Sequence, residues 1–251
     1  MNDMHDKTNQ ARRSFLGKLA AASGVAIAPG IMLHQVAQAR SPEEPATDQQ
    51  RWGILINANA CAEGCNACVT ACEQEYGWGQ SSGENETHSR PDQRAQWIRI
   101  VRVTDKLTGH TMRMPVMCQH CETPPCVDVC PTGASMKRAD GIVLVDKHIC
   151  IGCRYCMMAC PYKARSFIHE NLRDQKVSEP RGKGTVESCT LCVQRVDAGK
   201  QPVCVEACPD AMLFGDLMDP GSEISRELAR HGGEQIRADL GLNTGVRYQG
   251  I

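Results

Sequence analysis

The 251-residue chain is poor in aromatic side chains and has no surplus of either charge. Phe, Trp and Tyr make up 4% of the residues, and 28 basic against 29 acidic residues leave a formal net charge of −1. This balance argues against nucleic-acid binding, which requires a basic surplus. With so few aromatics, we expect a core that is not built from them.

The sequence also lacks the motifs of common enzymes. It contains no Ser-His-Asp candidate, no P-loop, no G-x-G-x-x-G, and no C-x-x-C-H for covalent haem attachment. We therefore expect no catalytic constellation in this chain.

What the chain does contain is sixteen cysteines in four quartets, with no cysteine outside them. The last two cysteines of every quartet are separated by three residues, and a proline follows the last cysteine of quartets two, three and four. The third quartet matches the bacterial ferredoxin run C-x2-C-x2-C-x3-C-P residue for residue. In order, the quartets are Cys61, Cys65, Cys68 and Cys72; Cys118, Cys121, Cys126 and Cys130; Cys150, Cys153, Cys156 and Cys160; and Cys189, Cys192, Cys204 and Cys208.

This spacing indicates iron–sulfur clusters. A cubane 4Fe–4S cluster has four iron corners, each of which needs one thiolate, the soft ligand that such clusters select. Short spacers let one tight loop reach three corners. The chain is therefore predicted to carry four 4Fe–4S clusters and to move electrons. Since every thiol is assigned to iron, no coordination position is left open for a substrate.

Two other uses of cysteine compete with this interpretation. Disulfides would fit the even count, but cysteines two residues apart on one loop are poor bridging partners. Zinc also binds CxxC pairs, but a zinc ribbon accounts for two such pairs and not for three endings of the C-x3-C-P type.

Quartets two and three lie within residues 118–161, which is the size and order of a two-cluster ferredoxin. In such ferredoxins the fourth cysteine of each run serves the other cluster. This rule predicts two ligand sets in an inner module at about residues 112–170. Set 3 is Cys118, Cys121, Cys126 and Cys160, and set 4 is Cys150, Cys153, Cys156 and Cys130.

The N-terminus resembles a twin-arginine export signal over residues 1–39. Arg12-Arg13 precede a small, apolar stretch, and Ala37-Gln38-Ala39 is a cleavage site of the A-x-A type. This route exports folded proteins, as clusters assembled in the cytoplasm require, so we expect a periplasmic protein. The alternative is a retained membrane anchor, for which Gly24, Pro29 and Gly30 make a poor span.

Three cations near quartet three raise a hypothesis about redox tuning. Arg154, Lys163 and Arg165 are predicted to raise the potential of the cluster on Cys150, Cys153 and Cys156, because positive charge favours the reduced state. The alternative is that these side chains are solvated surface charges.

Other side chains near the ligands are assigned supporting positions. His120 and His148 are expected to be hydrogen-bond donors behind the ligands or surface groups, because no quartet lacks a thiol. Met157 and Met158 are expected to pack over a cluster.

Local patterns predict short elements around the quartets. The terminal segment at 240–251 shows no periodicity and is expected to fray. The expected elements are strands at 51–57, 97–103, 111–117 and 141–146, a helix at 65–76, an exposed loop at 77–96, and a helix that Asp219-Pro220 caps.

From Trp52 to about Asp219 the chain resembles the four-cluster ferredoxin subunits of respiratory membrane complexes. Within that family it is most similar to the DsrO type, the exported ferredoxin subunits of a sulfur-metabolism complex. The resemblance is carried by Pro115-Val-Met-Cys118-Gln-His-Cys121, Pro124-Pro125-Cys126-Val-Asp-Val-Cys130-Pro131, Gly141-Ile-Val-Leu-Val-Asp146, Cys150-Ile-Gly-Cys153-Arg-Tyr-Cys156, Cys189-Thr-Leu-Cys192-Val-Gln-Arg195 and Cys204-Val-Glu-Ala-Cys208-Pro209.

The resemblance implies an α+β fold. It consists of two ferredoxin-like halves of the bacterial two-cluster type, with small β-hairpins and short helices around four clusters. Residues 40–251 form this domain, in which an outer module comes from about 51–76 and 185–215 and a C-terminal tail covers 216–251. Symmetry and the resemblance together imply two outer ligand sets. Set 1 is Cys61, Cys65, Cys68 and Cys208, and set 2 is Cys189, Cys192, Cys204 and Cys72.

The resemblance also implies partners. These are an NrfD/DsrP-like integral membrane subunit that interacts with quinone, and cytochrome and other iron–sulfur subunits, so that membrane association is through partners. The expected function is an electron relay without its own catalytic site, in sulfite reduction or sulfur oxidation. Alternatives are the beta subunit of a molybdopterin oxidoreductase such as tetrathionate or polysulfide reductase, an iron–sulfur enzyme with an open cluster, and a zinc-binding interaction module.

Overall fold

A computed structural model describes residues 44–79, 90, 93–109, 111–172, 176 and 179–251. The predicted export signal at 1–39 lies outside the described residues. Within the described part of the chain, no helix has the length and hydropathy needed to cross a membrane.

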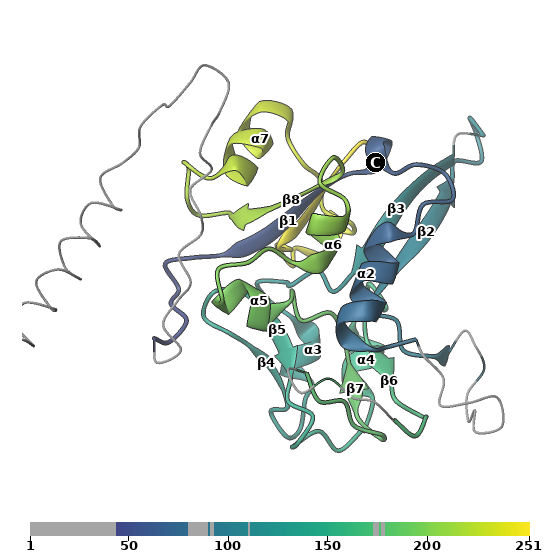
Figure 1. Cartoon of the computed structure of the whole chain (residues 1–251), viewed down its shortest axis with the longest axis vertical. Helices are drawn as coiled ribbons and strands as arrows, with labels where there is room; N and C mark the ends of the chain where they lie inside the picture. The colour runs from purple at the N-terminus through teal and green to yellow at the C-terminus, as the bar shows by residue number, and fades with distance from the viewer. Residues whose placement is uncertain (1–43, 80–89, 91–92, 110, 173–175, 177–178) are drawn as a thin grey trace, which may run out of the picture. The chain divides into compact units, whose positions relative to one another are not determined.

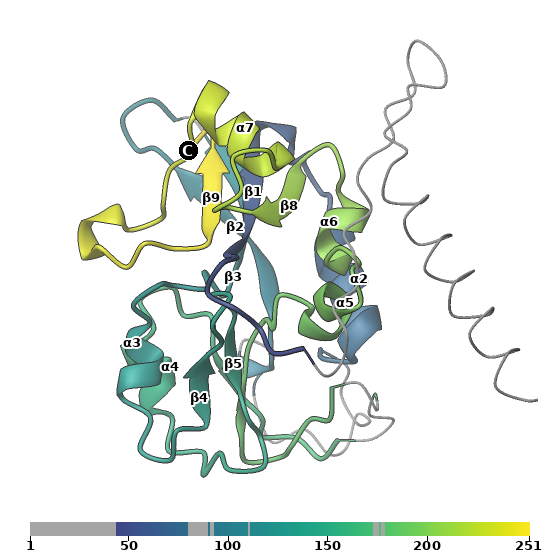
Figure 2. The same cartoon turned by 90° about the vertical axis from the view of Figure 1, so that its left-hand side faces the viewer.

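A three-stranded sheet joins the start of the described chain to its end. Strand β1 (Trp52–Asn57) lies between β8 (Met212–Asp216), to which it is antiparallel, and β9 (Val246–Gln249), to which it is parallel (Figures 1 and 2). The expectation that residues 240–251 fray is therefore wrong. Val246 and Tyr248 are fully buried, because alternate residues of β9 face the core while the strand pairs with β1.

Three hairpins complete the strands. β2 (Ile98–Thr104) pairs with β3 (Thr111–Met117), as expected, and Ile98 lies opposite Met117. β4 (Ser135–Lys137) pairs with β5 (Val143–Val145), and β6 (Ser166–Phe167) pairs with β7 (Val186–Glu187). The predicted mixture of helices with small antiparallel sheets is confirmed at this level.

Most helices are short, and four of them each carry the third cysteine of a quartet. Cys68 and Cys72 lie in α2 (Ala67–Tyr76), as the sequence predicted, and α2 packs against α6 (Val203–Ala207). The other such pair is α3 (Pro125–Asp128) and α4 (Tyr155–Ala159), which also pack together. Helix α5 (Val193–Asp197) lies between Cys192 and Cys204 of quartet four. η1 (Ala58–Ala60) and η3 (Ala238–Leu240) are single turns of 3-10 helix.

The scarce aromatics are concentrated inside the molecule, so the expectation of a core without them is wrong. Tyr76, Trp78, Trp97 and Tyr248 are the largest fully buried side chains. The Tyr76 and Trp97 rings lie 4.5 Å apart. Trp78 is an exception to the predicted exposed loop at 77–96, since only 1% of its surface is accessible, while residues 80–89 and 91–92 of that loop lie outside the described residues.

The last helix, α7 (Glu223–His231), begins later than expected. Ser222 caps it, and its hydroxyl accepts a hydrogen bond from the Ser225 amide at 3.2 Å. Serine is a preferred N-cap residue, which explains why the helix does not start at Asp219-Pro220. Ile224 anchors the helix in the core.

Candidate iron–sulfur cluster sites

All four cysteine loops share one backbone feature. The residue before the second cysteine has a left-handed conformation, at Gly64 (φ 77°), His120 (φ 44°), Gly152 (φ 70°) and Leu191 (φ 54°). Glycine adopts this conformation without strain, whereas His120 and Leu191 carry a cost that surrounding structure must offset. Loops of different spacer length therefore share a left-handed residue at the same position before the second thiol.

Three thiols of quartet one lie near the last cysteine of quartet four. Burial and the neighbouring Cys208 and Cys61 thiols raise the pKa of Cys68 to about 12. Burial raises the pKa of Cys208 as well, and Cys65 and Cys61 act on it in the same direction. The structure therefore brings together the four thiols of set 1, because α2 packs against α6.

The four thiols of set 2 line one cavity. Cys72, Cys189, Cys192 and Cys204 line this cavity together with residues of the α2 and α6 segments. Burial is the main cause that raises the pKa of Cys189 well above its usual value, and the other three thiols add to it.

The inner module gathers its thiols in the same way. Burial and the Cys126 and Cys160 thiols raise the pKa of Cys121 to about 12. Burial and the same two thiols also raise the pKa of Cys118. The four thiols of set 3 therefore lie near one another. The thiols of set 4, Cys130, Cys150, Cys153 and Cys156, line a second cavity.

These cradles fit cubane clusters by donor type and number. Each offers four thiols drawn from two chain segments, and the residues that line the set 2 and set 4 cavities include no carboxylate. Among the described residues, no group of three or more His, Cys, Asp or Glu side chains is placed to hold a single metal ion. When bound, a 4Fe–4S cluster accepts and gives up one electron. The ligand sets remain a prediction, and the structure brings together the same thiols that the sequence assigns to each set.

The four sets follow one another in space. Cys72 of set 2 interacts with Cys68 of set 1, Cys189 of set 2 with Cys118 of set 3, and Cys156 of set 4 with Cys126 of set 3. Sets 2 and 3 lie inside, while Cys153 of set 4 is the one exposed cysteine among the sixteen, all of which are described. The order 1–2–3–4 is that of a wire with an accessible end.

Two aromatic residues that the sequence patterns did not single out contact set 2. Trp78 Nε1 donates a hydrogen bond to Cys72 Sγ at 3.2 Å. Tyr76 interacts with the Cys192 thiol, and its hydroxyl accepts from Gln194 Nε2 at 2.8 Å. Their position directly after the first quartet, in a chain with so few aromatics, is the signal that could have identified them.

The structure separates the three cations near quartet three. Lys163 is exposed, and Arg154 is exposed with its guanidinium 3.8 Å from the centre of the Phe167 ring. Arg165 is buried, and its Nη2 donates to Cys126 Sγ at 3.2 Å. Of the three cations, Arg165 is therefore the one that donates to a thiol, and this thiol belongs to set 3. The sequence suggested an effect on the cluster of set 4.

The remaining assignments divide between core and surface. His120 is buried and its Nδ1 accepts from the Val143 amide at 3.0 Å, so it supports the set 3 loop. His148 is exposed. Met157 packs beside sets 3 and 4, but the prediction for Met158 is wrong, because its side chain is 74% accessible.

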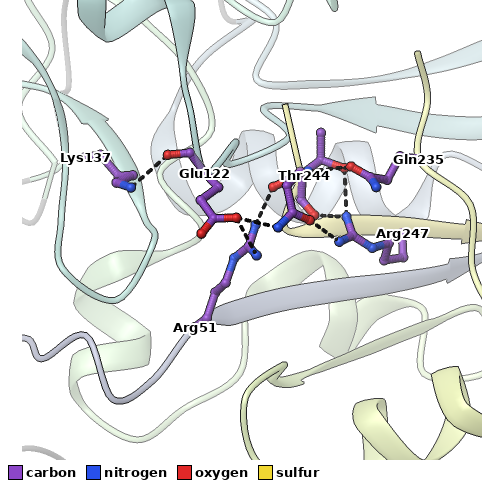
Figure 3. A network of polar contacts seen from close by, with 7 residues as sticks. Arg51, Glu122, Lys137, Gln235, Thr244 and Arg247 are labelled. Carbon is purple, nitrogen blue, oxygen red and sulfur yellow. Dashed lines mark hydrogen bonds and ion pairs between the residues drawn. The ribbon is translucent and has the colours of Figure 1, made fainter. Parts of the chain in front are cut away.

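A polar network fixes the set 3 loop to the C-terminal segment (Figure 3). Glu122, next to Cys121, forms an ion pair with Arg51 at 3.4 Å and accepts a hydrogen bond from Asn243 Nδ2. Its carbonyl accepts from Lys137 Nζ at 2.8 Å. Within the C-terminal segment, the Thr244 N–H donates a hydrogen bond to Gln235 Oε1 at 2.7 Å. We name residues 234–249 the C-terminal strap.

Comparison with known proteins is consistent with this arrangement. Two family descriptions, both "4Fe-4S dicluster domain", match residues 110–217 and 60–134. The chain is 38% identical to the "Hdr-like menaquinol oxidoreductase iron-sulfur subunit 1" of Archaeoglobus fulgidus, over 95% of this chain and 97% of that protein.

Two further relatives bear names from sulfur chemistry. The chain is 41% identical to a sulfite dehydrogenase subunit of Allochromatium vinosum, over 78% of this chain and 81% of that protein. It is 34% identical to a tetrathionate reductase subunit of Salmonella typhimurium, over 97% of this chain and 89% of that protein.

Proposed function

The chain belongs to the 4Fe–4S dicluster family of ferredoxin-type iron–sulfur subunits, and from that premise we propose that it relays electrons along a wire of four clusters. It is an electron-transfer subunit of an oxidoreductase complex, carries four 4Fe–4S clusters, and leaves catalysis to other subunits. The finer assignments concern ligands, direction, partners and compartment.

The proposed ligands are sets 1 to 4, held in two ferredoxin-like halves. The outer half is built around α2 and α6, and the inner half around α3 and α4. Each half closes because two short helices pack together and exchange their last cysteines. The order in which thiols of successive sets influence one another electrostatically, from Cys68 through Cys189 and Cys126 to Cys156, is the observation that carries the proposal of a single wire.

A redox partner is proposed to dock where set 4 approaches the surface. Four exposed apolar side chains stand near Cys153 in sequence: Ile149, Ile151, Tyr155 and Met158, with 47%, 67%, 56% and 74% of their surface accessible. Apolar groups gathered on a surface mark an interaction site. We name these four residues the set 4 patch. A partner that covers it brings its own cofactor close to the exposed thiol.

The proposed host is a membrane complex that exchanges electrons with quinol and takes part in sulfur metabolism. The names of the menaquinol oxidoreductase and sulfite dehydrogenase relatives support this choice. The membrane partner would be a quinone-interacting integral subunit, with cytochrome or iron–sulfur subunits next to it. A tetrathionate reductase is the second candidate host, supported by the relative of that name. A periplasmic location, reached folded through the twin-arginine route, is proposed from residues 1–39.

Metal analysis and purification test these proposals separately. Iron and acid-labile sulfide should be roughly sixteen each per chain, whereas stoichiometric zinc would overturn the cluster assignment. Purification from detergent-solubilised membranes should recover a multi-helix membrane subunit with this chain. Met158→Glu should reduce that recovery, while Leu107→Glu, an equally polar change at the β2–β3 turn, should not. Equal recovery with both variants would exclude the set 4 patch as the docking surface.

A further inference from the structure

Arg165 occupies a position between two predicted clusters. In the sequence it follows Cys160, a thiol of set 3, and directly precedes strand β6. In the structure, only 4% of its surface is accessible. Its Nη2 donates to Cys126 Sγ of set 3 at 3.2 Å, and its Nη1 donates to Ser135 Oγ at 2.6 Å. The guanidinium is therefore fixed at both ends by neighbours that belong to the cluster cradles.

Ser135 connects the same side chain to set 4. Its backbone N–H donates to Cys130 Sγ at 3.3 Å. On the other side of the cradle, burial raises the pKa of Cys156, and Arg165 opposes that effect. One guanidinium thus acts on thiols of both sets.

This buried charge has no carboxylate partner among the described residues, and its Nε has no hydrogen-bond acceptor there. An unpaired guanidinium in a low-dielectric interior is costly unless negative charge compensates it. Four thiolates around a cubane core supply that charge once the sets are loaded. The position of Arg165 is favourable only next to clusters whose overall charge is negative.

We propose that Arg165 sets the reduction potentials of the two clusters predicted on sets 3 and 4, raising both above the values that burial alone would give. Reduction adds one negative charge to a cluster. Burial disfavours that charge and an adjacent cation favours it. Because a single guanidinium serves both sets, its removal should lower two potentials together and leave sets 1 and 2 unchanged. This inference rests on the ligand sets of the proposed function.

The test is a redox titration of the intact protein followed by electron paramagnetic resonance. At a fixed potential near their midpoints, two of the four centres should show about a tenfold lower ratio of reduced to oxidised form in Arg165→Gln. That ratio corresponds to a shift of about 59 mV for one electron. Arg226→Gln is the matched control, since it removes an exposed arginine of α7, a helix that packs against β8 and β1, and should shift no centre. Wild-type potentials in Arg165→Gln would overturn the proposal.

A second variant separates charge from assembly. Arg165→Lys keeps the charge and should retain both the iron and potentials close to wild type. A tenfold change in Arg165→Lys at full iron content, or loss of iron in both variants, would overturn the proposal, because a charge effect does not require the guanidinium shape. The iron content of the wild type is measured first. An iron content far from roughly sixteen per chain rejects the proposed function. If the iron content is full and the reduction potentials of Arg165→Gln equal those of the wild type, only this inference is rejected.

Discussion

Cys121 and Thr244 face each other in an isolated antiparallel bridge. The first is a predicted ligand of set 3, and the second lies in the C-terminal strap. The adjacent Gly245 amide donates to the Gln119 and His120 carbonyls at 2.8 and 3.1 Å. A ligand loop is therefore held in place by a segment more than a hundred residues away in the chain.

Disturbing the strap should loosen the iron of set 3. A Cβ added at Gly245 would lie 3.1 Å from the Trp52 carbonyl oxygen and 3.2 Å from that of His120, both of them backbone atoms. Gly245→Ala should therefore cost about 1–3 kcal/mol, as overpacking does. About a quarter of the iron should leave faster in the presence of a chelator, because one cradle of four is affected.

Leu240→Ala is the control for the strap, because it alters an exposed side chain of the same segment. It should release iron at the wild-type rate. If Gly245→Ala also keeps all of its iron for as long as wild type, the strap does not hold the ligand loop.

Trp78 should tune the potential of the cluster on set 2. Its indole N–H donates to Cys72 Sγ, and such a bond is stronger when the cluster carries more negative charge. Trp78→Phe keeps the aromatic volume and removes the donor. A difference of about 0.5 kcal/mol between the redox states would lower that centre's potential by roughly 20 mV.

Trp97 provides the matched control for Trp78. It is equally buried, but its Nε1 has no hydrogen-bond partner among the described residues. Redox titration of Trp97→Phe should give wild-type potentials. Equal shifts in the two variants would assign the effect to packing instead of the hydrogen bond.

The fold could be predicted from the sequence wherever a pattern is local. Strand β1, helix α2 and the β2–β3 hairpin each extend over six or more residues and show their periodicity or turn directly. Strands β6 and β7 have two residues each, which is too short for a pattern. Strand β9 depends on β1, a partner near the other end of the chain, so its four residues give no local signal.

The candidate site was predictable in its thiols and less so in what surrounds them. Cysteine spacing indicates loop geometry. The predicted exchange of fourth ligands follows from the ferredoxin rule in the inner module, and from symmetry and the family resemblance in the outer module. The buried position of Arg165 depends on how β4, α3 and α4 pack, so the sequence could not separate it from the exposed Arg154. The Trp78 contact likewise arises from a turn after α2, where Gly77 adopts a left-handed conformation.

The two glycines that precede a second cysteine should respond differently to substitution. Both have positive φ, so alanine at either should cost about 1–2 kcal/mol. At Gly64 a Cβ meets nothing within 4 Å, whereas at Gly152 it would lie 2.1 Å from the Gly184 carbonyl oxygen. Gly152→Ala should therefore lose the iron of set 4, and Gly64→Ala should retain all of its iron. Iron counts and the number of paramagnetic centres measure this, and full occupancy in Gly152→Ala would contradict it.

A buried ion pair fixes the entry to the set 2 loop. Glu187, two residues before Cys189, accepts from Arg181 Nη2 at 2.7 Å and Nε at 2.9 Å, and the Glu187 side chain is fully buried. Arg181 Nη1 also donates to the Gly77 carbonyl at 2.7 Å, which ties the end of α2 to the same pair. These contacts hold two of the segments that form the set 2 cradle.

Breaking this pair on one side should be costly, and replacing both partners should not be. Glu187→Gln removes the negative charge from this buried pair and weakens its two hydrogen bonds from Arg181, which should destabilise the protein by about 3–5 kcal/mol. The double variant Arg181→Met with Glu187→Leu removes both charges and should recover much of that loss, although Gly77 then lacks its donor. Thermal unfolding with simultaneous measurement of released iron checks the order of stability among the wild type, the single variant and the double variant. The single variant should melt earliest and lose about one cluster's iron before the rest. A double variant less stable than Glu187→Gln would mean that the pair contributes more than its desolvation costs.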